Sequence, residues 1–293
     1  MKIKKIAVIG AGSMGGQIAE LLSRIGRYEV NLTDVNETIL SSTVTSIEER
    51  IDKFFVQKGK MDADEKRDVM ARIRSSKNLK EAVDGVDFAI EAVAENLTIK
   101  KEVFSQIEEI APERAIFASN TSYQSITELA SATKRPDKVI GAHFFNPVAM
   151  MKLVEVVKGA RTSQDTLNIT LETMRKLERE PVVCSDSSYG FLANRAYTAM
   201  VVEAVQMLWE RVADPKQIDM ALRLGYNLPM GPLELLDFTG GWAILENCEE
   251  DAIREVGPVN GHLHPLIRMM RRAGYDRIYD FYNECMAGSG AVS

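Results

Sequence analysis

The stretch IKKIAVIGAGSMGGQIAELLSRIG, residues 3–26, decides the fold of this chain. Residues 3–9 predict a short buried strand, because they are apolar apart from two lysines. The segment after the glycines predicts a helix, because its apolar side chains recur at helical spacing, at Ile18, Leu21, Leu22 and Ile25. The order strand, glycine-rich turn, helix is typical of the start of an α/β domain.

The turn carries a G-x-G-x-x-G pattern at Gly10, Gly12 and Gly15. In such a pattern the first glycine allows the tight turn, the second lets backbone approach a pyrophosphate, and the third lets helix and strand pack closely. The free amides and the dipole at the helix N-terminus favour the phosphates. Taken alone the pattern is weak, since a glycine turn also occurs without a ligand.

An acidic residue at the expected distance strengthens this prediction. Residues 29–34, EVNLTD, predict a second strand that ends in Asp34, nineteen positions after Gly15. A carboxylate there accepts hydrogen bonds from both ribose hydroxyls of a dinucleotide and repels a 2′-phosphate. The sequence therefore predicts a binding site for NAD rather than for NADP.

Helix and strand patterns continue to alternate beyond this unit, with helical stretches at 37–57 and 62–72 and apolar runs at 86–93, 115–118 and 138–142. After PVVCSDSSYG the pattern becomes purely helical. We therefore predict a Rossmann-like, doubly wound and mostly parallel sheet followed by an all-α C-terminal domain. The predicted domains are 1–186 and 187–293.

Several polar residues follow predicted strand ends, where ligands bind in sheets of this kind. They are Glu95, Lys100, Asn120 and Ser122. Ordinary loop polarity is the better explanation for each of them when it is taken singly.

The stretch HFFNPVAMMKLVEV, residues 143–156, begins with one of the three histidines of the chain. Glu155 follows His143 by twelve positions. His143 can be a structural residue bonded to a backbone carbonyl, with Glu155 a solvated charge. The two can also be a base and its carboxylate partner, and these residues alone leave both interpretations open.

The helical half contains one broad apolar face, formed by Tyr197, Met200, Val201, Ala204, Val205, Leu208 and Val212. Plain core packing explains such a face. In a domain of this size, a helix that is apolar on more than one side also frequently meets a second subunit, so we predict a homodimer through the helical domain.

Composition excludes several classes of function. The chain has 293 residues and a formal net charge of −6, which argues against a nucleic-acid partner. Cys184, Cys248 and Cys285 have no metal or disulfide spacing, so we interpret them as reduced core thiols of a cytoplasmic protein. His262 and His264 lie in a GHLHP loop that offers too few further ligands for a metal.

No stretch of the chain is apolar over the roughly 18 residues that a membrane span needs. The apolar run at the N-terminus is short, broken by glycines and leads into a helix, which disfavours a signal peptide. We therefore expect no membrane association.

The motifs occur in one order: the glycine turn, EAVAEN, SNTS, HFFNPV with MKLVEV, GFLANR and PMGPLELLD. This set resembles the L-3-hydroxyacyl-CoA dehydrogenase family, including 3-hydroxybutyryl-CoA dehydrogenases, over nearly the whole chain. The resemblance implies NAD-dependent interconversion of L-3-hydroxyacyl-CoA and 3-ketoacyl-CoA, as in fatty acid β-oxidation. It also implies a Rossmann-like domain followed by a helical, dimerising domain.

The resemblance assigns catalytic roles to Ser122, His143, Glu155 and Asn194. Removal of the alcohol proton suits a histidine that titrates near neutrality, and a carboxylate on its far nitrogen fixes the tautomer. Ser122 and Asn194 are expected to bond the C3 oxygen of the substrate, and Lys53 to lie near the CoA. The expected cofactor contacts are Gly10, Gly12, Ser13, Met14, Gly15, Asp34, Glu95, Lys100, Asn120, Ser122 and Asn146.

The chain departs from the family pattern in two places. The tail AGYDRIYDFYNE, residues 273–284, lacks the usual lysine and glycines, and Tyr189 stands where a proline is usual. Two alternatives therefore stay open: a related dehydrogenase of a free or sugar acid, as in the lambda-crystallin and gulonate branch, and an NAD-binding structural protein without turnover.

Overall fold

The computed structural model describes residues 2–187, 189–247 and 249–287. The chain forms two compact units, and the division falls between Phe191 and Leu192. The sequence pattern predicts the division after residue 186. The first unit extends further because the ring of Phe191 is buried in that unit's own core.

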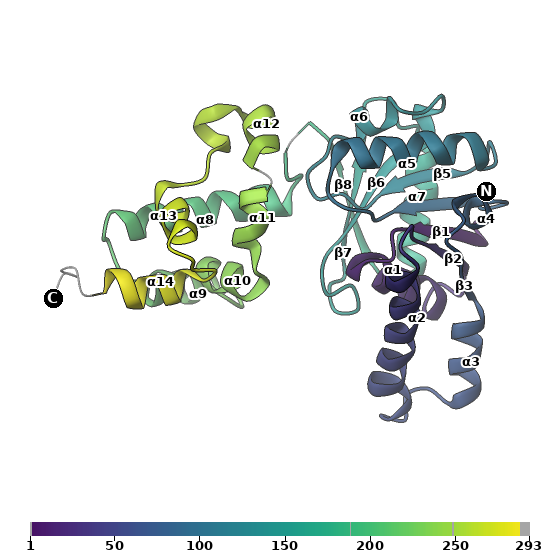
Figure 1. The fold of residues 1–293 in the computed structure, drawn as a ribbon, viewed down its shortest axis with the longest axis horizontal. Coiled ribbons are helices and arrows are strands. Elements are labelled where there is room, and N and C mark those ends of the chain that lie inside the picture. The colour runs from purple at the N-terminus through teal and green to yellow at the C-terminus, as the bar shows by residue number, and fades with distance from the viewer. Residues whose placement is uncertain (1, 188, 248, 288–293) are drawn as a thin grey trace. The chain divides into compact units, whose positions relative to one another are not determined.

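Within the described residues the first unit is built on one eight-stranded sheet, in the order β3-β2-β1-β4-β5-β6-β7-β8 (Figure 1). All neighbouring strands are parallel except β6 and β7. The strands are β1 (Lys5–Ile9), β2 (Glu29–Thr33), β3 (Ile73–Ser75), β4 (Phe88–Glu91), β5 (Ile116–Ser119), β6 (Val139–Phe144), β7 (Leu153–Lys158) and β8 (Glu180–Ser185). This arrangement confirms the predicted doubly wound, mostly parallel fold.

Helices cover both faces of this sheet (Figure 1). The central strand β1 explains why, since Ile6 and Val8 enter one apolar core while Ala7 and Ile9 enter the other. The helices are α1 (Ser13–Arg24), α2 (Glu37–Ile51), α3 (Ala63–Ala71), α4 (Leu79–Val83), α5 (Leu97–Ile110), α6 (Ile126–Ala130) and α7 (Gln164–Lys176), with a π-helical turn η1 (Asp52–Val56) and a 3₁₀ turn η2 (Pro136–Lys138).

Helix α5 begins at a position that matters for the site. The side chain of Asn96 accepts a hydrogen bond from the amide of Ile99, which fixes the first turn of the helix. Lys100 lies in that first turn and points inward, where it is buried. Glu95 directly precedes Asn96. Its carboxylate pairs with Lys100 at the carboxyl ends of the strands.

The second unit is helical throughout its described residues, which confirms the predicted all-α domain. Its core gathers around Trp242, which is fully buried, and includes four side chains of α8: Val201, Ala204, Val205 and Leu208. The helices are α8 (Ala193–Trp209), α9 (Pro215–Tyr226), α10 (Pro232–Thr239), α11 (Gly241–Asn247), α12 (Glu249–Gly261), α13 (Pro265–Arg272) and α14 (Ile278–Phe281), followed by a π-helical turn η3 (Tyr282–Met286).

The unusual tail belongs to the core of the second unit. Ile278 and Phe281 are buried there. The hydroxyl of Tyr279 donates a hydrogen bond to the carboxylate of Asp219 over 2.6 Å. The altered sequence of residues 273–284 therefore has a packing role within its own unit.

The cysteines correct one prediction. Cys285 is exposed, so its interpretation as a core residue was wrong, because it lies on the outer side of the last helical turn. Cys184 is half-buried in β8, and burial raises its pKa to about 11. Cys248 lies outside the described residues.

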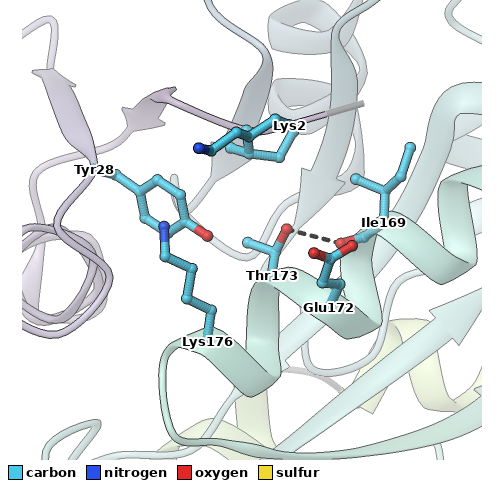
Figure 2. Close-up of a pocket in the computed structure, with 7 residues that line it drawn as sticks. Lys2, Tyr28, Ile169, Glu172, Thr173 and Lys176 are labelled. Carbon is cyan, nitrogen blue, oxygen red and sulfur yellow. Dashed lines mark hydrogen bonds between the residues drawn. The ribbon is translucent and has the colours of Figure 1, made fainter.

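A groove of about 420 Å³ lies at the opposite ends of the strands from Asp34 (Figure 2). Lys2 precedes β1 and Tyr28 precedes β2, so the groove is at the amino ends of parallel strands. Lys176 extends over the ring of Tyr28, 4.0 Å from its centroid. Because ligands of such sheets bind at the carboxyl ends, this groove is separate from the candidate site.

Candidate active site

The glycine turn has the geometry that a pyrophosphate requires. Gly10 has φ +102°, and a Cβ on it would lie 2.5 Å from the carbonyl oxygen of Ala92. A Cβ on Gly15 would overlap the carbonyl oxygen of Gly10, so helix and strand pack backbone to backbone. At Gly12, in contrast, nothing lies within 4 Å of the point that a Cβ would occupy, which leaves space for a phosphate group.

Asp34 is tied directly to this turn. One oxygen of its carboxylate accepts a hydrogen bond from the amide of Ala11 over 2.8 Å, and the other accepts from the amide of Asn36 over 2.9 Å. Each oxygen keeps a lone pair for a further donor. The carboxylate is therefore positioned beside the turn and can accept hydrogen bonds from ribose hydroxyls.

Gln17, which sequence reasoning missed, links helix α1 to the loop after β6. Its side chain donates to Asn146 over 3.1 Å and accepts from the amide of Val148 over 2.9 Å. Ser13 and Met14 begin the same helix, and Ser13 is exposed. The one sequence signal for Gln17 is its position, one helical turn after Ser13 on the nucleotide-binding helix.

His143 and Glu155 face each other across the antiparallel pair β6 and β7, where they are register partners. The ring nitrogen Nδ1 lies 2.8 Å from Oε2 of the carboxylate. Both side chains are buried, with His143 4% and Glu155 1% exposed. Glu155 is therefore no solvated charge, and the structural interpretation of the pair loses its main premise.

Ser122 completes a hydrogen-bonded chain with this pair. Its Oγ lies 3.1 Å from Nε2 of His143, on the side of the ring opposite to Glu155. A carboxylate only accepts hydrogen bonds, so Nδ1 carries the proton that is donated to Glu155. Nε2 is then left as a proton acceptor, which is the state that a general base requires.

Aromatic rings of the first unit lie beside the hydrogen-bonded series Ser122–His143–Glu155. The ring of Phe145 lies 4.4 Å from that of His143, and the ring of Phe191 lies 5.9 Å from it. Tyr189, at the position where a proline is usual, stacks on Tyr123 at 5.0 Å. The ring of His143 is therefore packed against apolar surface on the side where these phenylalanines lie.

Lys100 was expected to face the cofactor, but its side chain is buried near the carboxyl ends of the strands and the residue is only 1% exposed. Its ammonium lies 2.8 Å from Glu91 and 3.1 Å from Glu95. Burial works to lower the pKa of Lys100, but the two carboxylates outweigh it and the pKa is raised. Lys100 thus stays charged. Its contact at the carboxyl ends of the strands is the ion pair with Glu95.

The remaining predicted residues are spread over the chain. Asn120 follows β5 and its side chain accepts from the amide of Phe144 over 2.9 Å. Lys53 is exposed in η1, where its ammonium lies 5.5 Å from the ring centroid of Phe54. Asn194 is half-buried in α8 of the second unit.

The two histidines of the second unit have protein partners. His262 lies 3.0 Å from a carboxylate oxygen of Glu249, and His264 lies 2.9 Å from the side-chain oxygen of Gln206. Among the described residues no group of three or more potential metal ligands occurs. No helix in the described part of the chain is long and apolar enough to cross a membrane.

A dinucleotide turn and a histidine–carboxylate pair at the edge of one doubly wound sheet define a class of protein, the dinucleotide-dependent dehydrogenases. Comparison with known families makes this specific. Residues 5–187 match the family model "3-hydroxyacyl-CoA dehydrogenase, NAD binding domain", and residues 190–280 match the C-terminal domain of the same family. The chain belongs to the 3-hydroxyacyl-CoA dehydrogenase family.

Individual relatives agree with this assignment. The chain is 40% identical to the 3-hydroxybutyryl-CoA dehydrogenase of Clostridioides difficile, over 92% of this chain and 94% of that protein. It is 40% identical to the mitochondrial hydroxyacyl-coenzyme A dehydrogenase of Sus scrofa, over 81% and 76% of the two chains. The crystal structure of (S)-3-hydroxybutyryl-CoA dehydrogenase from Ralstonia eutropha matches with a TM-score of 0.87 at 35% identity, over 94% and 95% of the chains.

Proposed function

We propose that this protein interconverts L-3-hydroxyacyl-CoA and 3-ketoacyl-CoA with NAD as the cofactor, and that Ser122, His143 and Glu155 carry the proton chemistry. The observation behind the proposal is the chain of contacts from Ser122 through His143 to Glu155, with distances of 3.1 and 2.8 Å. The relatives named above are hydroxyacyl-CoA dehydrogenases, so the free-acid and the non-catalytic alternatives are not favoured.

In the oxidative direction, Nε2 of His143 takes the proton of the C3 hydroxyl while C3 loses a hydride and its carbon–oxygen bond becomes a carbonyl. When bound, NAD supplies the nicotinamide ring that accepts this hydride. Glu155 bonds Nδ1–H throughout and stabilises the imidazolium that forms. In the reductive direction His143 returns the proton to the C3 oxygen.

Ser122 is placed to orient the substrate. One substrate oxygen can lie within hydrogen-bonding distance of both Nε2 and Ser122 Oγ, because these two atoms are 3.1 Å apart. A second donor on the same oxygen fixes its position and stabilises charge that develops on it. We assign the same role to Asn194 of the second unit, and a contact with the CoA moiety to Lys53.

For the cofactor we propose NAD at the glycine turn, with Asp34 on the adenosine ribose. The open space at Gly12 and the free lone pairs of Asp34 support this choice. Val35, which follows, is an apolar side chain with 95% exposure and can pack against the adenine. The further proposed contacts are Gly10, Ser13, Met14, Gly15, Glu95, Asn120, Ser122 and Asn146.

We also propose that the protein is a cytoplasmic homodimer, joined through the helical domain, and that it binds neither nucleic acid nor membrane. Large apolar side chains are exposed on the second unit and support a second copy as the partner. They are Val202, Trp209, Val212, Met220, Leu224, Tyr226 and Phe238. Light scattering at micromolar concentration tests the dimer, and a stable monomer would refute it.

Steady-state kinetics test the reaction. Reduction of acetoacetyl-CoA, followed by loss of NADH absorbance, is expected to proceed with the purified protein, and free acetoacetate is expected to be a poor substrate. A preference for the free acid would support the sugar-acid branch. No turnover with either would support the structural alternative.

A further inference from the structure

The SNTS turn that carries Ser122 is held by one carboxylate. Oε1 of Glu95 accepts from the amide of Ser122 over 3.0 Å and from the amide of Tyr123 over 3.2 Å. The hydroxyl of Thr121 donates to the same oxygen. The backbone amides of Ser122 and Tyr123 and the hydroxyl of Thr121 therefore converge on a single acceptor.

Thr121 spreads this restraint along the turn. Its Oγ1 accepts from the amide of Gln124 over 2.9 Å and from the amide of Tyr123 over 3.3 Å. Because its own proton is given to Glu95, the hydroxyl is oriented and both lone pairs face the turn. A change in the position of Glu95 is thus transmitted to four consecutive residues.

Glu95 is itself fixed by an ion pair with Lys100. Its second oxygen lies 3.1 Å from the buried ammonium of Lys100, which also lies 2.8 Å from Glu91. Glu91 is fixed in turn by the amide of Val93 and by the hydroxyl of Ser119, over 2.7 and 2.5 Å. The network is anchored on the last residues of β4 and β5, which are rigid parts of the sheet.

We propose that Glu95, fixed by Lys100, is a positioning residue that sets Ser122 against His143 for the reaction. Glu95 acts through the turn, since its bonds reach the serine backbone and the serine hydroxyl reaches Nε2 at 3.1 Å. This role rests on the proposed function and adds to it. It is distinct from a contact with NAD, which would change how strongly the cofactor binds and not how the serine is aligned.

The decisive variant is Glu95→Gln. An amide has one acceptor oxygen and one donor nitrogen in place of two acceptor oxygens. Either the nitrogen meets the donors of the turn or it meets the ammonium of Lys100, so one side of the network is broken. We expect kcat for acetoacetyl-CoA reduction at saturating NADH to fall about 10-fold, in line with the loss of a positioned transition-state contact.

A double-mutant cycle with Ser122→Ala identifies the route of this effect. If Glu95 acts through Ser122, then Glu95→Gln has little further effect on kcat in the Ser122→Ala background, within about 2-fold. Losses that multiply would overturn the proposal. So would a Glu95→Gln enzyme whose only defect is a raised KM for NADH, because that result describes a cofactor contact alone.

Lys101 provides a control for the Lys100–Glu95 pair, because it is a lysine of the same helix whose carboxylate partner lies outside the turn. Lys101 lies next to Lys100 on α5 and pairs with Glu128 over the same distance, 2.8 Å, but this pair is partly exposed. Lys101→Met should therefore leave kcat unchanged, and an equal loss there would count against the proposal. Thr121→Val is a second probe, since it removes the hydroxyl link to Glu95 and should lower kcat in the same direction as Glu95→Gln.

Nuclear magnetic resonance separates this proposal from the proposed function. The chain has three histidines, so the ring signals of His143 can be assigned by substitution. Glu95→Gln should move these signals in the same direction as Ser122→Ala does, whether or not the protein turns over acyl-CoA. Turnover failing in the wild-type protein would refute the function, whereas unmoved His143 signals in Glu95→Gln would refute the positioning role.

Discussion

The two units bury carboxylates in different ways. In the first unit the buried Glu91 shares the ammonium of Lys100 with Glu95, which is partly exposed, and the buried Glu155 bonds the ring of His143. In the second unit, buried carboxylates are bonded mainly by neutral donors. Asp219 accepts from the amides of Leu233 and Glu234 and from a tyrosine hydroxyl, and Asp237 accepts from the amides of Ile278 and Tyr279 and from Trp242.

The difference lies in what each carboxylate holds. Asp219 and Asp237 bond amides at the first turns of α10 and α14, so they fix helix ends to the core. Glu95 and Glu155 bond the Ser122 turn and His143, the groups to which we assign the proton chemistry. The task of an acid can therefore be identified from the groups that its hydrogen bonds hold in place, and burial alone does not reveal it.

The largest expected effect tests the catalytic side of this comparison. His143→Gln should lower kcat by about 10² to 10⁴, because a general base is lost, while the affinity for NADH stays nearly unchanged. Stopped-flow or steady-state kinetics and a fluorescence titration measure the two quantities. His264→Gln in the second unit is the control and should retain kcat, and a near-normal His143→Gln enzyme would return His143 to a structural role.

Removal of the charge of Glu155 should affect the reaction less than loss of the His143 ring does. Glu155→Gln keeps the size of the side chain but no longer stabilises the imidazolium. Alcohol oxidation needs the neutral ring, and a histidine without its carboxylate holds its proton less tightly. The pH at which oxidation switches on should therefore move down. An upward shift in the pH–rate profile would contradict the assigned role.

Much of the first unit could be predicted because its signals are local. The glycine turn, the strand that ends before Asp34 and the alternation of elements all follow from spacing along the chain. The contact between His143 and Glu155 was predictable only as a hypothesis, since it depends on β6 and β7 being antiparallel and in register. Spacing does not reveal strand direction.

Other contacts could not be predicted, whether their partners lie near in the sequence, as for Lys100, or far away, as for Gln17. Lys100 is polar and follows a strand, which suggested a ligand contact, yet its partners make it a buried structural charge. Gln17 reaches Asn146 across more than a hundred residues, and no local pattern indicates that pairing. The short strand β3 has too few residues to show a period, so it was missed.

The structural side of the comparison is tested by Asp237→Asn. The amide presents a donor to amides that need an acceptor, so unfolding free energy should fall by about 1 to 3 kcal/mol, with kcat per folded molecule retained. Denaturant titration measures the first quantity. A loss of kcat without a loss of stability would show that this carboxylate belongs with Glu95 and Glu155.

The same variant should change the pH dependence of stability. Burial raises the pKa of Asp237, which means that the folded chain binds this proton more tightly than the unfolded chain. The stabilising effect is present below the ordinary carboxyl pKa and is lost as the pH rises through the folded value. Asp237→Asn should remove this decline, and an unchanged pH profile of unfolding would contradict the assignment.

The smallest expected effect concerns Asp34, a carboxylate at the surface of the first unit that bonds an amide as the aspartates of the second unit do. Its Oδ2 accepts from Ala11 over 2.8 Å, so Asp34→Asn can keep that bond through its remaining oxygen. The charge that repels a 2′-phosphate is lost, however. The gap between NADH and NADPH affinity should therefore narrow by about 1 kcal/mol, a factor of roughly 5.

Fluorescence titration of both cofactors measures this gap. Glu37→Gln is the matched control, since it removes one negative charge three positions further on, where the carboxylate is exposed and paired with Lys77. Solvent screens such a charge, so this variant should leave the gap unchanged. If Asp34→Asn and Glu37→Gln narrow the gap equally, a general field and not a ribose contact selects the cofactor. If Asp34→Asn only unfolds the turn, Asp34 has the structural task of Asp219 and Asp237.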